Sequence, residues 1–331
     1  MWSTTQSLFS FFSVLCTLVQ AKPHANPQWH HRHSRGVAAS PTSSTTTTTT
    51  STSPTPSTPQ SSGTTSDSSS PNIGILYDST SDLSAFSGQV GFSVDWSPIP
   101  LSSSDNLDLG TFYPQLWTFQ DSNHLNPWTN AAPSWPSGIN LIGFNEPDMP
   151  GQSWMTPSTA ISGWNYIAQY QSSKDAKIST PGVSNSVVSL GTIDGVANPA
   201  GQEWMSQFLS LAASNSPKYT FQAISMHWYG SSSLTVDENG AMLNEQAGAM
   251  IQLAEDNGIP EVWITEMGSG YDTSTATEDC QFIQWLEGTF MKNASNSMIT
   301  HYAYNEHLGT LLNGDAMTSS GSALLGGSGS C

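Results

Sequence analysis

The chain has 331 residues and a formal net charge of −18, from seven basic and 25 acidic residues. This balance excludes nucleic acid and anionic membranes as the main partner, since both need a basic surface. Apolar residues make up 36% of the chain and charged residues 10%, both below the usual shares. Twelve tryptophans are many for this length, and they predict ring-stacking surfaces as well as core packing.

The first segment predicts secretion. Residues 1–21 read as a signal peptide, because the apolar run 8–19 is too short and too interrupted by Ser to span a bilayer. A buried first helix is the alternative. Residues 22–71 form a His-rich and then Ser/Thr/Pro-rich linker, in which positions 40–70 hold 24 Ser or Thr. Such a segment buries too little apolar area to fold, so we expect a disordered, O-glycosylated spacer. We assign no function to its histidines at 24–33.

The remaining residues, 72–331, form the predicted catalytic domain. They carry 24 acidic residues and four lysines, a net charge of −20. Cys16 leaves with the signal, and the two remaining cysteines, Cys280 and Cys331, predict one disulfide in an oxidising compartment. A free or intermolecular Cys331 is the alternative. Asn293 begins a sequon and predicts N-glycosylation.

Eight strands are predicted along this domain. Most of them are bounded by Gly, Pro or polar clusters. They cover residues 72–78, 90–96, 112–119, 139–145, 177–183, 221–229, 261–266 and 299–305.

Amphipathic helices are predicted between several of the strands. The clear patterns cover 157–171, 203–213, 241–256 and 278–291, and weaker ones cover 80–88 and 121–138. Thr156 predicts an N-cap with Pro157 in the first turn, and Gly258 predicts the end of the third helix. The segment 275–278 (Thr-Ala-Thr-Glu) predicts a capping box.

Alternating strands and helices predict an α/β fold with a parallel sheet, and eight strands fit a closed (β/α)8 TIM barrel. An open doubly wound sheet is the rival fold, but no Gly-x-Gly-x-x-Gly follows the first strand. In a barrel, catalytic groups lie at the carboxyl ends of the strands. The strand ends therefore become the list of candidate site residues.

Two of the predicted strands lead directly into glutamates, Glu146 after the fourth and Glu266 at the seventh. Glycoside hydrolysis needs one protonated carboxylic acid at the leaving oxygen and one ionised carboxylate at the sugar carbon. Carboxylates on nearly opposite walls of a barrel can flank a bond held over its mouth. A solvated surface position is the alternative for either glutamate. The pair predicts a glycosidase.

Three motifs carry a resemblance to a known family. They are Leu-Ile-Gly-Phe-Asn-Glu-Pro-Asp at 141–148, Met-His-Trp-Tyr-Gly at 226–230 and Val-Trp-Ile-Thr-Glu at 262–266. Asn-Glu-Pro and Thr-Glu resemble the large superfamily of retaining (β/α)8 glycosidases. The full set resembles glycoside hydrolase family 128, fungal endo-β-1,3-glucanases, over about residues 72–310.

The resemblance implies roles for individual residues. It implies Glu146 as the general acid/base, Glu266 as the nucleophile and Asn145 as a contact to the sugar 2-hydroxyl. His227 and Tyr229 are two apart on one strand, so both face the same side. If that side is the barrel mouth, Tyr229 can hydrogen-bond Glu266, while a satisfied core imidazole is the alternative for His227. Asp148 is expected to cap the loop or helix beyond the fourth strand rather than to do chemistry.

Aromatic residues at strand ends are candidates for sugar stacking. We expect at least two tryptophans of the set Trp96, Trp117, Trp154 and Trp228 to line a groove, although core packing is the alternative for each. The eighth strand departs from the family, which usually shows an aromatic pair ending in Trp there. This chain has Tyr304, which offers a smaller face for stacking on a sugar.

These features predict a secreted, extracellular or cell-wall retaining hydrolase, an endo-glucanase-like enzyme on fungal β-1,3-glucan, with no cofactor and no membrane association in the mature form. We expect a monomer whose partner is the polysaccharide. The domain contains no paired His motif of the kind that binds a catalytic metal, so a metal enzyme is disfavoured. The alternatives are a glycosidase on β-1,6-glucan or β-mannan, and a non-catalytic glucan-binding wall protein. Linkage preference, endo or exo action and wall attachment stay open.

Overall fold

A computed structural model describes residues 72–78, 82–101, 106–215, 219–306, 310–327 and 329–331. The chain divides into two units, residues 1–63 and 64–331, and every described residue belongs to the second. The predicted signal peptide and linker lie outside the described residues, so those two domain assignments stay predictions.

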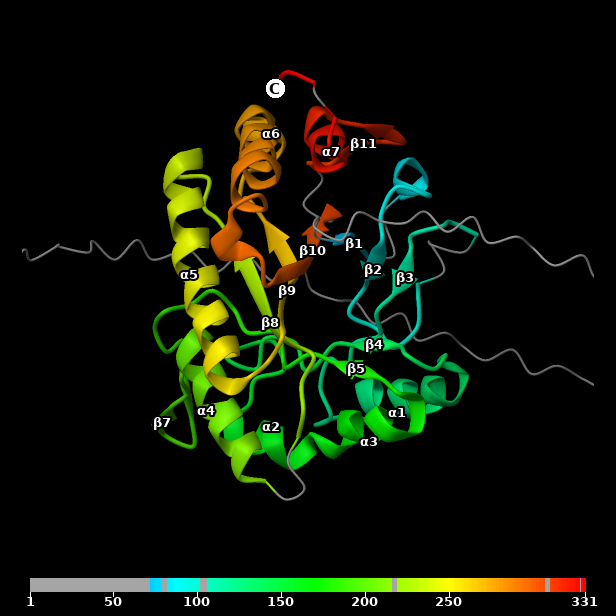
Figure 1. Ribbon diagram of the computed structural model, residues 1–331, viewed down its shortest axis with the longest axis vertical. Coiled ribbons are helices and arrows are strands. Elements are labelled where there is room, and N and C mark those ends of the chain that lie inside the picture. The colour runs from blue at the N-terminus through cyan, green and yellow to red at the C-terminus, as the bar shows by residue number, and fades with distance from the viewer. Residues whose placement is uncertain (1–71, 79–81, 102–105, 216–218, 307–309, 328) are drawn as a thin grey trace, which may run out of the picture. The chain divides into compact units, whose positions relative to one another are not determined.

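Eight parallel strands form a closed barrel, and Figure 1 shows how they are arranged. Six of them hydrogen-bond in the order β3-β2-β1-β10-β9-β8, and β4 pairs with β5. Single parallel bridges close the ring, from Gln115 to Ile142 between β3 and β4, and from Ser179 to Ala223 between β5 and β8. The strands are Asn72–Leu76 (β1), Phe92–Val94 (β2), Thr111–Phe112 (β3), Asn140–Leu141 (β4), Lys177–Ile178 (β5), Ala223–Tyr229 (β8), Glu261–Gly268 (β9) and Ile299–Asn305 (β10).

The predicted strands and the (β/α)8 fold are confirmed. Each of the eight predicted ranges contains or overlaps one barrel strand, in the same order. Three strands are much shorter than predicted, because the chain leaves the regular ladder towards the barrel mouth. Pro114 and Pro181 lie just beyond β3 and β5, and proline has no backbone N–H to give to a ladder.

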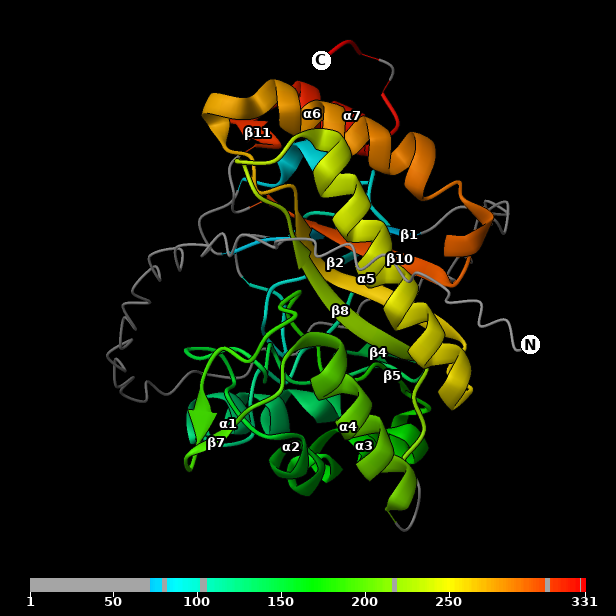
Figure 2. The ribbon, with the colours of Figure 1, turned by 90° about the vertical axis from the view of Figure 1, so that its left-hand side faces the viewer.

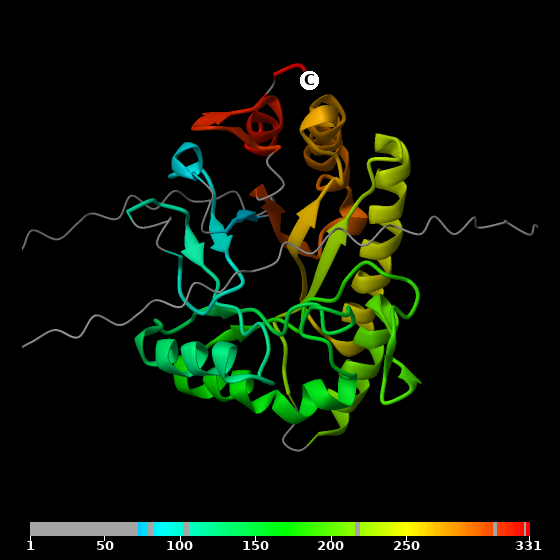
Figure 3. The same ribbon diagram turned by 180° about the vertical axis from the view of Figure 1, so that it is seen from behind.

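Helices cover the outside of the barrel, and α5 packs against β8 and β9 (Figure 3). They are Ser122–Ala131 (α1), Pro157–Gly163 (α2), Asn165–Lys174 (α3), Gly201–Ser214 (α4), Val236–Asn257 (α5), Ala276–Trp285 (α6) and Ser319–Leu324 (α7). Short 3-10 turns cover Ser84–Phe86 (η1), Ala132–Ser134 (η3), Thr273–Thr275 (η4) and Ala294–Asn296 (η6), and a π-helical turn covers Leu286–Phe290 (η5).

Local capping chemistry explains where several helices begin and end. The Thr156 side chain caps α2 with Pro157 in its first turn, and Gly258 ends α5 with a φ of 66°, both as predicted. The helix predicted over 157–171 is two helices that meet at Trp164. The predicted capping box at 275–278 is wrong, because the Thr275 hydroxyl accepts from the Asp272 backbone N–H in a box one turn earlier.

The apolar core has two parts, one inside the barrel and one between the barrel and its helices. The inner cluster includes Leu76, Phe92, Val94, Tyr113, Ile142, Ala223, Trp263 and Ala303, with Trp96 packed against it. The outer cluster is larger and includes Trp164, Trp204, Trp228, Tyr302 and Tyr304. A side chain on a barrel strand therefore faces one cluster or the other, according to its place in the alternation along the strand.

Two short hairpins follow barrel strands. Thr192–Ile193 (β6) pairs with Val196–Ala197 (β7) between β5 and α4. Leu312–Asn313 (β11) pairs with Ala316–Met317 (β12) after β10. Both hairpins lie at the left in Figure 2. Among the described residues, no helix combines the length and apolar character that crossing a bilayer requires.

The predicted disulfide is confirmed, since Cys280 in α6 is bonded to Cys331, 51 residues further on. It ties the end of the described chain to the outer helix layer. Asn293 is exposed and accepts a hydrogen bond from the Ser295 backbone N–H. Its glycosylation stays a prediction.

Replacing Cys280 by Ser should lower the free energy of unfolding. Closing a loop of about 50 residues contributes roughly 4 kcal/mol in the chain-entropy model. For a domain of this size that loss lowers the Tm by roughly 10 °C. Thermal unfolding followed by circular dichroism measures it, and Cys280→Ser/Cys331→Ser is the control that should no longer respond to a reductant. An unchanged Tm in the single variant would contradict the prediction.

Candidate active site

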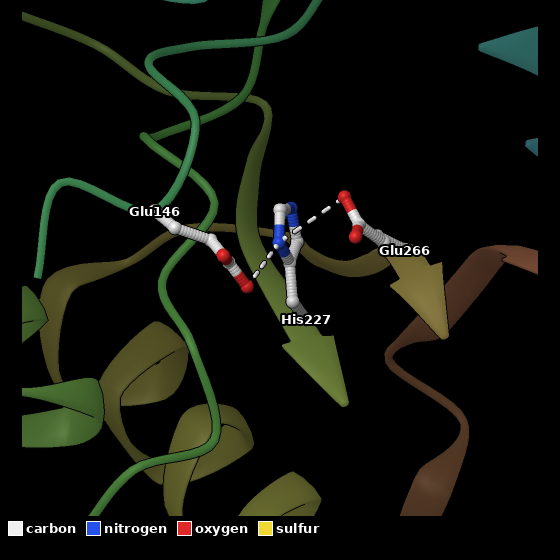
Figure 4. A group of neighbouring side chains, drawn as sticks. All are labelled: Glu146, His227 and Glu266. Carbon is white, nitrogen blue, oxygen red and sulfur yellow. Dashed lines mark hydrogen bonds and ion pairs between the residues drawn. The ribbon is translucent and has the colours of Figure 1, made fainter. Parts of the chain in front are cut away.

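Glu146, His227 and Glu266 lie together where β4, β8 and β9 meet the barrel mouth (Figure 4). Nδ1 of His227 is 3.1 Å from Oε1 of Glu146 and 3.5 Å from Oε2 of Glu266. All three side chains are buried. The imidazole thus bridges two carboxylates that come from opposite parts of the sheet.

The separation of the two carboxylates indicates their chemistry. One oxygen of Glu146 and one of Glu266 lie within 4.8 Å of each other. Retaining glycosidases hold their carboxyl groups about 5–5.5 Å apart, whereas inverting enzymes need about 6.5–9.5 Å to admit a water. The pair is close enough for one carboxylate to attack a sugar carbon while the other protonates the leaving oxygen, and its nearest oxygens are closer to the retaining than to the inverting spacing.

The backbone at Glu146 is strained, with a φ of 40° that non-glycine residues rarely adopt. The Glu146 N–H donates to the Gly182 carbonyl at 2.8 Å, and this bond anchors the strained turn to the segment that follows β5. Gly182 also leaves room for the imidazole, because a Cβ there would lie 2.3 Å from Nε2 of His227. This close approach explains a glycine at that position.

Asp148 stabilises the turn at Glu146 through buried hydrogen bonds. It is fully buried, and its carboxylate accepts from the Ser184 N–H at 3.0 Å, the Ser184 hydroxyl at 2.6 Å and the Gly201 N–H at 2.8 Å. Gly201 is the first residue of α4. Asp148 therefore joins the turn to the loop after β5 and to the first residue of α4. The expected cap of the helix beyond the fourth strand is wrong, because Thr156 caps that helix, α2.

Neutral donors surround the Glu266 carboxylate. The Tyr229 hydroxyl donates to Oε1 at 2.7 Å, as predicted, and the Trp96 indole N–H donates to Oε2 at 2.9 Å. The Asn305 amide donates in turn to the Tyr229 hydroxyl at 2.7 Å, which aims the tyrosine proton at Glu266. These hydrogen bonds stabilise negative charge on Glu266 and fix its direction.

Burial sets the protonation of the site. It raises the pKa of the Glu146 carboxyl, although the hydrogen bond from His227 opposes the shift. The pKa of His227 is also raised, since the carboxylates of Glu266 and Glu146 together outweigh the cost of burying its charge. The raised pKa of Glu146 favours its protonated form, which a general acid needs.

A Glu-Glu-His set at this spacing could also hold a cation. The N–H of Trp96 and the O–H of Tyr229 each take one acceptor position on a Glu266 oxygen, which stabilises the carboxylate charge and weakens its attraction for a cation. The hydrogen bonds therefore favour the catalytic use of the pair.

Other predicted site residues lie around this centre. Asn145 is buried, and its amide donates to Gln152 at 3.1 Å while its carbonyl oxygen accepts from Gln115 at 3.3 Å. Trp96 reaches the site with a φ of 58° and partial exposure. The Trp117 ring is partly exposed and stacks on His124, with centroids 4.7 Å apart. The substrate contacts expected of Asn145, His227, Tyr229, Trp96 and Trp117 stay predictions.

Two of the predicted sugar-binding residues are wrong. Trp228 is fully buried and stacks on Phe282 of α6, with centroids 5.2 Å apart. Tyr304 is fully buried too, and its hydroxyl donates to Asp279 at 2.7 Å. Both side chains belong to the outer cluster, because they alternate with His227, Tyr229 and Asn305, which face the interior.

Two residues at the site were missed from the sequence. Asn305 ends the eighth strand, directly after Tyr304, and the strand-end rule would have found it. Gln115 follows the third strand and orients the Asn145 amide. Nothing in the local sequence distinguishes Gln115 from an ordinary polar residue in a loop.

A family model described as the glycosyl hydrolase catalytic core matches residues 74–328. No curated protein matches the chain. Several solved structures match this chain, and the match covers nearly the whole length of each of them. A curdlan-specific exo-β-1,3-glucanase of glycoside hydrolase family 128 from Blastomyces gilchristii, bound to glucose, is 26% identical with a TM-score of 0.59, covering 76% of this chain and 97% of that one.

Two further structures of the same family share the fold. An endo-β-1,3-glucanase from Amycolatopsis mediterranei, in complex with laminaritriose, is 22% identical with a TM-score of 0.56, covering 77% of this chain and 98% of that one. One from Sorangium cellulosum is 18% identical with a TM-score of 0.57, covering 77% and 97%. The family resemblance drawn from the three motifs is confirmed.

Replacing His227 by Leu should move the basic limb of the kcat/KM profile to higher pH. His227 lowers the pKa of Glu146 by its hydrogen bond and charge, so its loss lets that pKa rise further. A general acid works below its pKa, so activity would then persist to higher pH. We also expect the maximal rate to fall, by up to roughly 100-fold, because the carboxylates lose their bridge.

His227→Gln is the matched comparison, since it can still donate a hydrogen bond but carries no charge. Its basic limb should lie between those of the wild type and His227→Leu. Full pH profiles on one soluble substrate measure this order. A limb that stays fixed, or moves to lower pH, would contradict the assigned electrostatics.

Proposed function

The chain belongs to the glycosyl hydrolase catalytic core family, and we propose that this glycoside hydrolase cleaves β-1,3-glucan with retention of configuration. The observation that carries the mechanism is the buried Glu146–His227–Glu266 arrangement, with carboxylate oxygens within 4.8 Å. In this proposal Glu266 is the nucleophile and Glu146 the general acid/base.

In the first step the Glu266 carboxylate attacks the anomeric carbon while Glu146 donates its proton to the glycosidic oxygen. The carbon–oxygen bond breaks, the shortened chain leaves as an alcohol, and the sugar is covalently attached to Glu266. In the second step Glu146, now ionised, takes a proton from water. The water oxygen attacks the anomeric carbon and Glu266 is released as carboxylate.

The substrate proposal rests on the family and on charge. The three family members named above act on β-1,3-glucans by their descriptions, one as an exo enzyme and two as endo enzymes. A domain with a net charge of −20 repels anionic chains and tolerates a neutral glucan. Endo and exo action both remain compatible with this site. Another neutral polysaccharide, β-1,6-glucan or β-mannan, is the second candidate.

We infer that the protein works outside the cell, at a fungal wall. The signal-like segment 1–21 and the Ser/Thr-rich linker support export. The Cys280–Cys331 disulfide is also suited to an oxidising compartment.

Glu266→Gln should lose nearly all turnover on every substrate, because no glycosyl-enzyme can form. Glu146→Gln should lose turnover on glucan but keep a large part of it on an aryl glycoside with a good leaving group, which needs no acid in the first step. Initial rates of both variants on the two substrates measure this. Equal losses of both variants on the aryl glycoside would refute the roles.

The substrate is tested on a panel of defined polysaccharides. Laminarin should be cleaved, with cellulose and β-1,4-mannan degraded much more slowly, and the first product should keep its anomeric configuration by NMR. Protein that leaves laminarin intact but degrades mannan would overturn the substrate while sparing the two carboxylates. An inverted product would overturn Glu266 as nucleophile.

A further inference from the structure

An exposed apolar surface lies beside the catalytic acid. We call residues 186–198 the aliphatic hairpin; they include β6 and β7 and follow the fifth barrel strand (Figure 2). Four of the eight large apolar side chains exposed among the described residues belong to this segment. Val187 is 94% and Val196 71% exposed, and Val188 and Leu190 are exposed as well. Exposed apolar side chains gathered in one short segment are a mark of binding surfaces.

The aliphatic hairpin is fastened to the loop that carries Glu146. The Asn198 amide donates to the Pro147 carbonyl at 3.2 Å and to the Met155 carbonyl at 3.3 Å. Its backbone N–H donates to the Gly191 carbonyl at 3.0 Å, which closes the base of the hairpin. The hairpin therefore holds a fixed position relative to the acid/base.

Trp154 extends the same surface from the loop after β4. Its ring lies against Gly191, where an added Cβ would be 3.4 Å from the ring. Trp154 is partly exposed, and Asp194 is the one charged residue in 186–198. The surface thus offers an aromatic ring and aliphatic side chains with little charge, which suits the C–H faces of neutral sugars and not an anionic ligand.

The position of this surface in the barrel indicates which part of the substrate it can contact. A general acid protonates the oxygen of the leaving group, so the leaving chain passes on the side of Glu146. The aliphatic hairpin and Trp154 belong to the loops after β5 and β4, the two strands on that side, whereas Glu266 is on β9. The surface is therefore on the same side of the barrel as Glu146 and is joined to the turn that carries it.

We propose that the aliphatic hairpin and Trp154 form a platform that binds the leaving-group side of a neutral β-glucan chain. This proposal rests on the proposed function and adds a binding site beyond the sugar that Glu266 attacks. The platform contributes to affinity for long chains and nothing to chemistry on the attacked sugar.

The test is the double variant Val187→Ser/Val196→Ser, assayed on laminarihexaose and on an aryl β-laminaribioside. Loss of two exposed valine side chains that the bound glucan would cover should lower kcat/KM on the hexasaccharide by roughly tenfold. Turnover of the aryl substrate, which has no sugar on the leaving-group side, should stay within about twofold. Leu211→Ser/Met242→Ser is the matched control, since these exposed residues lie on α4 and α5.

The outcomes separate this proposal from the proposed function. Wild-type protein that cleaves neither substrate refutes the proposed function. Wild-type activity with an unchanged hairpin variant, or with equal losses on both substrates, refutes the platform. A hairpin variant whose size-exclusion mass falls while its hexasaccharide kinetics stay unchanged would instead assign the surface to contact between copies of the chain, and would likewise overturn the platform.

Discussion

The contact on which the structure depends is the one between His227 and two buried carboxylates. Two glutamates with oxygens within 4.8 Å repel each other if both are ionised, and burial penalises each charge. The imidazole between them, with Nδ1 near both, reduces that repulsion. Glu146 and Glu266 are 120 residues apart in sequence. Only the closed barrel brings the ends of β4, β8 and β9 close enough for this contact.

The two carboxylates receive different surroundings, and this difference divides their roles. Glu266 accepts hydrogen bonds from a tyrosine and a tryptophan, both of which stabilise its charge. The pKa of Glu146 is raised by burial, with repulsion from Glu266 adding to the shift. One side chain is therefore prepared to attack and the other to give up a proton. The strained turn at Glu146, held by Gly182 and Asp148, keeps this geometry fixed.

Much of this arrangement could be predicted from the sequence, because it depends on local patterns. Bounded apolar runs located all eight barrel strands, and apolar runs that end in a carboxylate located Glu146 and Glu266. Spacing by two along one strand predicted that Tyr229 would reach Glu266. The same rule, applied to the residue between His227 and Tyr229, would have placed Trp228 against the helices. Trp228 and Tyr304 were both assigned to sugar binding because they are aromatic. Their places in the strand alternation put both side chains against the helices instead.

What the sequence could not supply is the long-range packing that supports the site. Gln115 orients Asn145 only because the third and fourth strands are neighbours in the closed barrel. None of the hydrogen bonds and ion pairs described for the site comes from lysine or arginine, and residues 72–331 contain only four lysines. The donors at the site are an indole, a phenol, an amide and one imidazole, all at close range and buried or half-buried. Salt screens exposed charges far more than buried pairs, so the electrostatics of catalysis here follow from burial and hydrogen-bond geometry rather than from the strongly acidic surface.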